Sequence, residues 1–347
     1  MSLSKLANAA SAEERSEALD RWEGEHGGAF ELMAVGQLPE VLRPELTATV
    51  SRELLVAYAA ARRRFLEAIE LDDPSIFDVD APESRFHMAL YSIVQHLEGD
   101  LEEARPIIEE LLESGDAEMM RVASGLMEKM SAAGFSFETA RRTMARHGIN
   151  EIPYKLGNAV ANWVRADPAR VAEIEAALVE GEDLEKQALC AVLQDLGEAA
   201  APLLDRLLEV ARSDELDPES RSCAISTLGA LGVVNSLVSE AIEQALRSPH
   251  WFIRGNAAGV AGSLVLDPPH FIPLVMCLLE DDEGHDWSPS EKAVEALGKY
   301  GPAAVDAIGA IEALRAATES DDTWLLDEIE RALALIRGDE PPPREDD

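Results

Sequence analysis

RSCAISTLGALG, residues 221–232, decides the fold, because related stretches recur at a regular interval in the C-terminal half of the chain. The related stretches begin at Lys186, Arg254 and Ser290, and the four starting residues lie 35, 33 and 36 residues apart. A period of this size with one helix-length apolar pattern inside it is typical of solenoids made of stacked helical hairpins. The sequence therefore predicts an all-α fold, a right-handed α-solenoid of stacked antiparallel helix pairs.

Small residues near the end of each first helix support this interpretation. The pairs Leu228-Gly229, Ala261-Gly262 and Leu297-Gly298 place a glycine where it costs up to about 1 kcal/mol in helix propensity. We expect a close approach of two helices to compensate for that cost. Second helices are expected to begin after Gly197, Gly232, Pro268-Pro269 and Gly301-Pro302, and caps are expected at Asp217-Pro218, Ser248-Pro249 and Ser288-Pro289.

The four stretches resemble HEAT-like repeats of the kind also found in phycobilin lyases. The resemblance is strongest in RSCAISTLGALG and in RGNAAGVAGSLV from Arg254, weaker in KQALCAVLQDLG from Lys186 and SEKAVEALGKYG from Ser290, and covers roughly 184–338. It implies a HEAT/armadillo-like fold. HEAT-like arrays serve as adaptors, enzyme subunits and occasional enzymes, so the resemblance leaves the function open.

The chain is expected to contain four regions. These are an N-terminal helical cap at 1–70, a degenerate helical-repeat region at 85–183, the regular repeats at 184–338, and a disordered acidic tail at 339–347. In the first region, one helical stripe is expected to face the core, with the residues Val50, Leu54, Ala57, Ala61, Phe65 and Ala68. The last helix, from Thr323 to Arg337, is expected to cap the array. Whether 1–180 is degenerate repeat or a separate domain stays open.

The composition favours a basic protein partner. The chain has 67 Asp and Glu against 30 Lys and Arg, a formal net charge of -37, with 47% hydrophobic and only 5% aromatic residues. Such a field repels phosphate backbones, so nucleic acid is an unlikely partner. An alternative explanation of the charge is adaptation of the whole proteome for solubility.

No motif in the sequence indicates catalysis, a cofactor or a metal. Cys190, Cys223 and Cys277 form no CxxC pair, and the seven histidines form no HExxH arrangement. The acidic loop with Asp281, Asp282, Glu283, His285 and Asp286 matches no calcium-loop spacing, and it is interpreted as an exposed connection between repeats. We therefore predict no catalytic residues and no metal ligands.

We expect no membrane-spanning segment and no secretion signal from this sequence. The N-terminus lacks a continuous apolar region, and Asp267-Pro268-Pro269 interrupts the longest apolar stretch, near 259–279. Cytoplasmic residence is the default expectation.

These observations predict a non-enzymatic scaffold or adaptor that binds a protein or peptide through a concave surface built mainly by the second helices. The residues expected to contact the partner are polar residues of the second helices and two aromatic residues at the start of a repeat: Arg206, Glu209, Glu240, Glu243, Gln244, Trp251, Phe252, Asp306 and Glu312. A sharper version is an inhibitor or immunity-type protein. The alternative is a HEAT-like enzyme or enzyme subunit, similar to a tetrapyrrole lyase or a base glycosylase.

Overall fold

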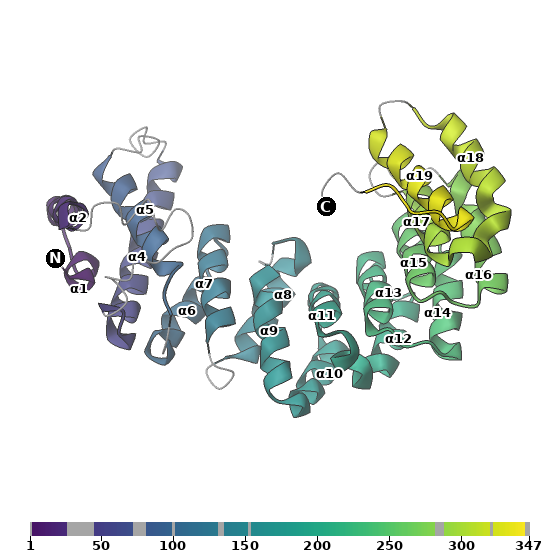
Figure 1. Ribbon diagram of the computed structural model, residues 1–347. Helices are drawn as coiled ribbons and strands as arrows, with labels where there is room; N and C mark the ends of the chain where they lie inside the picture. Colours follow the sequence, from purple (N-terminus) through teal and green to yellow (C-terminus); the bar gives the residue numbers. More distant parts are fainter. Residues whose placement is uncertain are drawn as a thin grey trace. The chain divides into compact units, whose positions relative to one another are not determined.

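The structure is a computed structural model that describes residues 2–25, 45–71, 81–98, 101–130, 135–151, 154–281, 288–319 and 322–343. Its chain forms two compact units, Met1–Ala166 (unit 1) and Asp167–Asp347 (unit 2). Within the described ranges, all regular structure is helical (Figure 1). The boundary between the two units falls inside the region 85–183, which the sequence predicts as a single region. The four predicted regions are defined by repeat regularity, and they stay a prediction.

Unit 1 contains nine labelled helical elements in its described residues. They are α1 (Leu3–Ala7), α2 (Ala12–Glu25), α4 (Ala48–Glu70), α5 (Pro82–Val94), η3 (Glu102–Ala104), α6 (Arg105–Leu112), α7 (Ala117–Lys129), α8 (Phe137–Glu151) and α9 (Tyr154–Ala166). The long helix α4 is central, because α1, α5, η3 and α6 all contact it. Within 85–183 the sequence also predicts two junctions between paired helices, around Gly99-Asp100 and around Gly134, and both lie outside the described residues.

The core face of α4 differs in part from the predicted stripe. Leu54 and Ala61 are buried as expected, whereas Ala57 and Phe65 are only half-buried. The fully buried Tyr58 lies on the core face instead. The predicted stripe contains apolar residues alone. It therefore omits Tyr58, whose hydroxyl makes its hydrogen bond inside the unit.

Unit 2 is the regular stack that the repeat predicts. Its elements are η4 (Pro168–Arg170), α10 (Val171–Glu180), α11 (Asp183–Leu196), η5 (Gly197–Leu203), α12 (Leu204–Arg212), α13 (Pro218–Leu231), α14 (Ser236–Leu246), α15 (Trp251–Ser263), α16 (Pro268–Met276), η6 (Cys277–Glu280), α17 (Pro289–Tyr300), η7 (Gly301–Ala307), α18 (Ile308–Ala317) and α19 (Thr323–Arg337). The first helices are α11, α13, α15 and α17, and the second helices are α12, α14, α16 and α18.

Predicted helix boundaries in unit 2 are largely confirmed. Asp217 accepts a hydrogen bond from the Glu219 backbone N–H, and Ser288 accepts one from the Glu291 backbone N–H. The cap predicted at Ser248-Pro249 is wrong, because α15 begins only at Trp251 and the Ser248 hydroxyl accepts from the His250 backbone instead. The capping helix α19 has the predicted bounds and packs against α17 and α18.

Glycines allow the first helices to pack closely against one another. A Cβ added to Gly262 would lie 2.6 Å from the Ala296 Cα, and one added to Gly229 would lie 2.8 Å from the Val260 Cγ2. A Cβ at Gly298 would lie 3.0 Å from the Ala332 Cα in α19. The prediction that these glycines permit a close helix approach is therefore confirmed.

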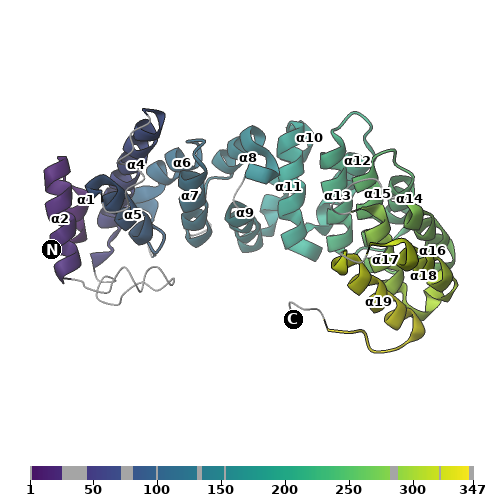
Figure 2. The same cartoon turned by 90° about the horizontal axis from the view of Figure 1, so that it is seen from above.

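The second helices lie on the outer side of the curve of unit 2. In both views of Figures 1 and 2, α12, α14, α16 and α18 lie outside the row formed by α13, α15, α17 and α19. Successive first helices contact each other extensively, whereas successive second helices contact each other much less. The prediction that the second helices build a concave surface is therefore wrong for unit 2. The glycines shorten the spacing between first helices, and the row with the shorter spacing forms the inside of the curve.

Val265 occupies a backbone position that the other repeats give to glycine. The first helices α11, α13 and α17 end at Gly197, Gly232 and Gly301, all with positive φ. In the third repeat the matching residue is Val265, with φ 48°. A β-branched residue in this region is strained.

Gly262→Ala tests the close approach between α15 and α17. The new methyl would meet the Ala296 backbone, so we expect the free energy of unfolding to fall by about 1–3 kcal/mol. The matched control is Gly259→Ala in the same helix, where nothing lies within 4 Å of the added Cβ. That variant should be neutral or gain up to about 1 kcal/mol in helix propensity. Urea unfolding of both variants measures the difference, and equal effects would contradict the account.

Val265→Gly should stabilise the protein, because glycine adopts positive φ without steric cost. We expect a gain of about 1 kcal/mol after the greater entropy of glycine in the unfolded chain is subtracted. The exposed Val234 offers a control, since Val234→Gly relieves no positive φ. Thermal unfolding measures both, and a loss of stability in Val265→Gly would rule out strain at this turn.

Candidate functional sites

Ion pairs between neighbouring elements use most of the charged residues predicted to contact a partner. Arg206 lies 3.2 Å from Glu175 of α10 and 2.7 Å from Glu209. Glu240 of α14 lies 3.7 Å from the guanidinium of Arg212 in α12. The Arg206–Glu175 pair therefore joins α12 to α10, and the Glu240–Arg212 pair joins α14 to α12. The role of these residues in binding stays a prediction.

The same arrangement continues toward the C-terminus. Glu243 pairs with Arg247 and lies 2.9 Å from the His270 Nε2 in α16. Hydrogen bonds from Arg247 and His270 lower the pKa of the Glu243 carboxyl. Glu312 of α18 pairs with Arg337 of α19 at 2.8 Å. Five of the residues predicted to contact a partner thus form ion pairs and are called the ladder residues: Arg206, Glu209, Glu240, Glu243 and Glu312.

Gln244 and Asp306 are exposed, and Asp306 forms no ion pair within the described ranges. Trp251 and Phe252 are half-buried and lie edge to face, with ring centroids 5.4 Å apart. Each aromatic ring is thus partly available and partly packed.

The arginine that opens a repeat has a structural role. Arg254 lies 2.7 Å from Asp281 and donates to the backbone oxygens of Ser248 and Pro249. It therefore holds the connection before α15 to the end of η6. Asp281 belongs to the predicted acidic loop, and the other residues of that loop singled out by sequence lie outside the described residues.

The three cysteines lie in different environments. Cys190 is buried and Cys277 is exposed, and Cys223 is half-buried. Burial raises the pKa of Cys223 to about 11 and raises that of Cys190 further. Among the described residues, no group of three His, Cys, Asp or Glu side chains is arranged to hold a metal ion. No described helix is both long and apolar enough to cross a membrane.

A polar cluster that sequence reasoning missed joins three helices of unit 1. The Tyr58 hydroxyl donates to Glu118 Oε1 at 2.8 Å, and the His87 Nε2 lies 2.9 Å from the same oxygen. Arg62 lies 2.9 Å from both Glu118 Oε2 and Asp116 Oδ2. Since His87 is only 2% exposed, substrate has no access to it, and the cluster is interpreted as structural.

The electrostatics of this cluster favour the ionised carboxylates. Burial would raise the pKa of Glu118, but the hydrogen bonds from His87 and Tyr58 and the charge of Arg62 outweigh it and lower that pKa. Asp116 is similar: burial opposes ionisation, and the hydrogen bond from Arg62 prevails, so its pKa is lowered. Burial and the neighbouring Glu118 carboxylate raise the pKa of Tyr58.

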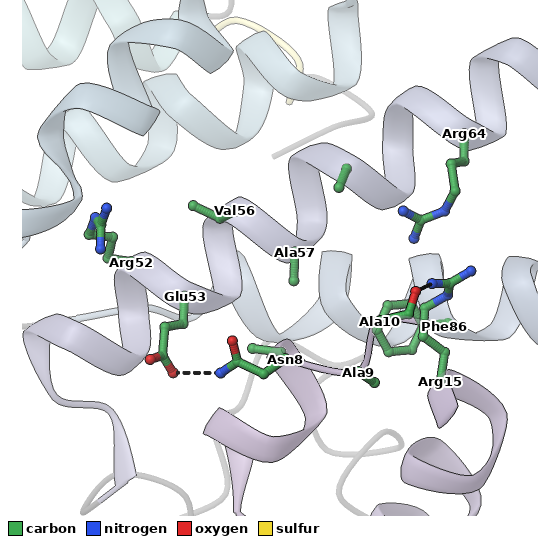
Figure 3. Close-up of a pocket in the computed structure, with 12 residues that line it drawn as sticks. Asn8, Ala9, Ala10, Arg15, Arg52, Glu53, Val56, Ala57, Arg64 and Phe86 are labelled. Atoms are coloured by element: carbon green, nitrogen blue, oxygen red, sulfur yellow. Dashed lines mark hydrogen bonds between the residues drawn. The ribbon is translucent and has the colours of Figure 1, made fainter. Parts of the chain in front are cut away.

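An arginine-lined cavity of about 520 Å³ lies between α1, α2, α4 and α5 of unit 1 (Figure 3). Its lining comprises Ala7, Asn8, Ala9, Ala10, Arg15, Arg52, Glu53, Val56, Ala57, Ala60, Arg64 and Phe86. Arg52, Val56, Ala60 and Arg64 recur every four residues along α4, a spacing that places them on one face. That spacing was the available sequence signal for this cavity.

Comparison with known proteins identifies the fold. No family model and no curated protein matches the chain. The structure of Kap121p bound to Nup53p is similar, with 11% identity and a TM-score of 0.53 over 97% of this chain, which spans 41% of the length of that one. Two further structures have lower TM-scores. YibA of Escherichia coli is 12% identical over 78% of this chain and 96% of its own length, with a TM-score of 0.41. Human deoxyhypusine hydroxylase is 14% identical over 74% of this chain and 91% of its own length, with a TM-score of 0.31. The chain is an α-solenoid with the fold of HEAT-repeat proteins.

Glu118→Gln tests the polar cluster. It removes the negative charge that Arg62 and His87 contact, so we expect a loss of about 1–3 kcal/mol in unfolding free energy at pH 7. Because the folded pKa of Glu118 is lowered, its contribution is present above the unfolded pKa of about 4.3 and is lost as pH falls through the folded value. The gap between wild type and variant should therefore narrow below about pH 4.

The control for this test is Glu138→Gln on α8, an exposed carboxylate with no ion pair among the described residues. It should leave stability within about 0.5 kcal/mol of wild type. Urea unfolding from pH 7 to pH 3 provides the comparison. A gap that is constant with pH would show that the charge of Glu118 has no stabilising role.

Proposed function

We propose that this protein is a non-catalytic helical-repeat scaffold that binds a protein or peptide partner with a basic surface. The fold supports the first part, since stacked helix pairs present extended surfaces. The similar Kap121p structure is a complex with Nup53p, a case of such a fold holding a protein partner. Residence in the cytoplasm and a role as an inhibitor or immunity-type protein belong to the same proposal.

The observation that carries the proposal is the charge balance of one layer of helices in unit 2. This second-helix layer comprises η4–α10, η5–α12, α14 with its C-cap Arg247, α16–η6 and η7–α18. Every arginine in this layer forms an ion pair within the described residues. Exposed acids remain without one in the same ranges, among them Asp205, Glu280 and Asp306. The layer therefore retains negative charge after its cations are paired.

This negative charge would mainly increase the rate at which the partner associates, and it would contribute less to the packing of the bound complex. Complementary charges at the rim of an interface accelerate encounter, and salt screens them within about 10 Å at 0.1 M. The ladder residues Arg206, Glu209, Glu240, Glu243 and Glu312 would form the surface on which the partner lies, with Gln244 and Asp306 exposed beside them. Trp251 and Phe252 would supply apolar contact area at the start of α15.

Affinity purification of the full chain from its native cells tests the proposal. The variant Asp205→Lys/Glu280→Lys/Asp306→Lys reverses three unpaired charges of the second-helix layer. The control Glu13→Lys/Glu67→Lys/Glu138→Lys makes the same change in net charge at exposed positions of unit 1 that form no ion pair with any residue the structure describes. We expect wild type and control to retain the same basic protein, identified by mass spectrometry, and the first variant to retain at least about tenfold less.

Two outcomes would contradict the proposal. Retained proteins that are all acidic would show that charge does not select the partner, and equal losses in both triple variants would move the interaction away from the second-helix layer. The alternative of a tetrapyrrole-lyase-like or base-glycosylase-like enzyme predicts instead a pigment absorbance band in the purified protein or retained DNA.

A further inference from the structure

The cavity of unit 1 has a positively charged end in a strongly acidic protein. Arg15 and Arg64 both contact Glu83, Arg15 through its Nε and Nη2 and Arg64 through its Nε at 3.5 Å from Glu83 Oε2. Two guanidinium groups thus share one carboxylate. Figure 3 shows the Arg64 guanidinium pointing toward Arg15 and Phe86 at this end of the cavity.

The Arg64 guanidinium has N–H donors that are not used in hydrogen bonds. The Nε atom is buried and makes no hydrogen bond, and the contact with Glu83 is the only ion pair of Arg64 among the described residues. Arg15, in contrast, is engaged, because its Nη1 donates to the Ala10 backbone oxygen at 2.6 Å. Arg64 can therefore bind an incoming anion through its two terminal NH2 groups without breaking the Arg15 contacts, because its side chain is 38% exposed and its contact with Glu83 uses the Nε atom.

The remaining acid in the cavity does not neutralise this end. Glu53 Oε2 accepts from the Ser4 hydroxyl at 2.6 Å and from the Asn8 amide at 3.2 Å (Figure 3). Arg52, at the same end as Glu53, is exposed and forms no ion pair within the described ranges. Arg15, Arg52 and Arg64 thus supply three guanidinium groups to the cavity lining, and Glu53 supplies its one carboxylate among the described residues. Even when Glu83 is counted, the ion-pair partner of Arg15 and Arg64 outside the lining, this group of residues carries a net positive charge.

An apolar wall separates the two charged ends. Val56, Ala57 and Ala60 lie on the face of α4 between Arg52 and Arg64, and Val56 is 48% exposed. Phe86, only 1% exposed, closes the cavity beside Arg15, whose guanidinium carbon lies 5.9 Å from the ring centroid. A cavity of about 520 Å³ with an apolar wall and a few convergent polar groups is typical of small-molecule sites.

We propose that this cavity binds a small organic anion, with its carboxylate or phosphate group at Arg64 and an aliphatic body against Val56, Ala57 and Ala60. Guanidinium groups bind both kinds of anion through paired N–H donors. The aliphatic body is stabilised by leaving water, and the anion is stabilised by the guanidinium groups that line the cavity. This site lies in unit 1 and is independent of the partner surface proposed for unit 2.

Titration calorimetry of the full chain with hexanoate, hexyl phosphate and hexanol tests the site. Hexanol has the same aliphatic chain without the charge, so it isolates the contribution of the anion. We expect saturable binding of hexanoate or hexyl phosphate, with the tighter of the two identifying the preferred group, and at least about tenfold weaker binding of hexanol. Binding of hexanol as tight as that of both anions would overturn the proposal, as would absence of saturation with all three.

Variants locate the site. Arg64→Gln should weaken anion binding at least about tenfold, because it removes the available charged donors. Arg63→Gln is the matched control: it lies next to Arg64 on α4, pairs with Glu110 and does not line the cavity. It should bind as wild type does, and equal weakening by both variants would mean that the anions respond only to overall charge.

A second variant guards against misfolding of Arg64→Gln. Val56 is half-exposed, so Val56→Glu should fold and place a negative charge on the apolar wall. We expect it to abolish binding of hexanoate and hexyl phosphate while the thermal unfolding temperature stays near that of wild type. Unchanged affinity in Val56→Glu would place the ligand elsewhere and overturn the proposal.

Discussion

The close approach of successive first helices is the constraint on which unit 2 depends. A helix pair of this size buries its apolar face only against its neighbours, so the spacing between pairs determines how much surface leaves water. Gly229, Gly262 and Gly298 set that spacing on one side of the stack. The second helices, which lack such a row, contact each other less on the outer side, and the Arg212–Glu240 ion pair and the Glu243–His270 contact are among their links.

Much of this could be predicted from sequence, because the information is local and periodic. The repeat interval gave the helix pairs, Gly232 and Gly301 marked helix ends, and the small residues at Gly262 and Gly298 indicated close packing. The side on which the stack curves could not be predicted the same way. Curvature depends on the difference in spacing between two layers, and the sequence pattern of one layer does not contain that difference.

The candidate sites were harder to predict, since each joins residues distant in the chain. Glu118 meets Tyr58 and His87 only because α4, α5 and α7 pack together, and nothing in the three local sequences indicates it. The three adjacent arginines Arg62 to Arg64 look alike in the sequence, yet they have three different roles: Arg62 is in the buried cluster, Arg63 in a surface ion pair, and Arg64 in the cavity. The excess of acids in the sequence, however, is also found in the second-helix layer, where the arginines are paired and some acids are not.

Hydrogen exchange of the intact protein, followed by mass spectrometry, tests the central claim about unit 2 most directly. If the packed row of first helices holds the stack together, amides of α13, α15 and α17 should be the slowest to exchange in unit 2, because they open only with the whole stack. Amides of α12, α14 and α16 should exchange faster through local opening. Slower exchange in the second helices than in the first would contradict the account.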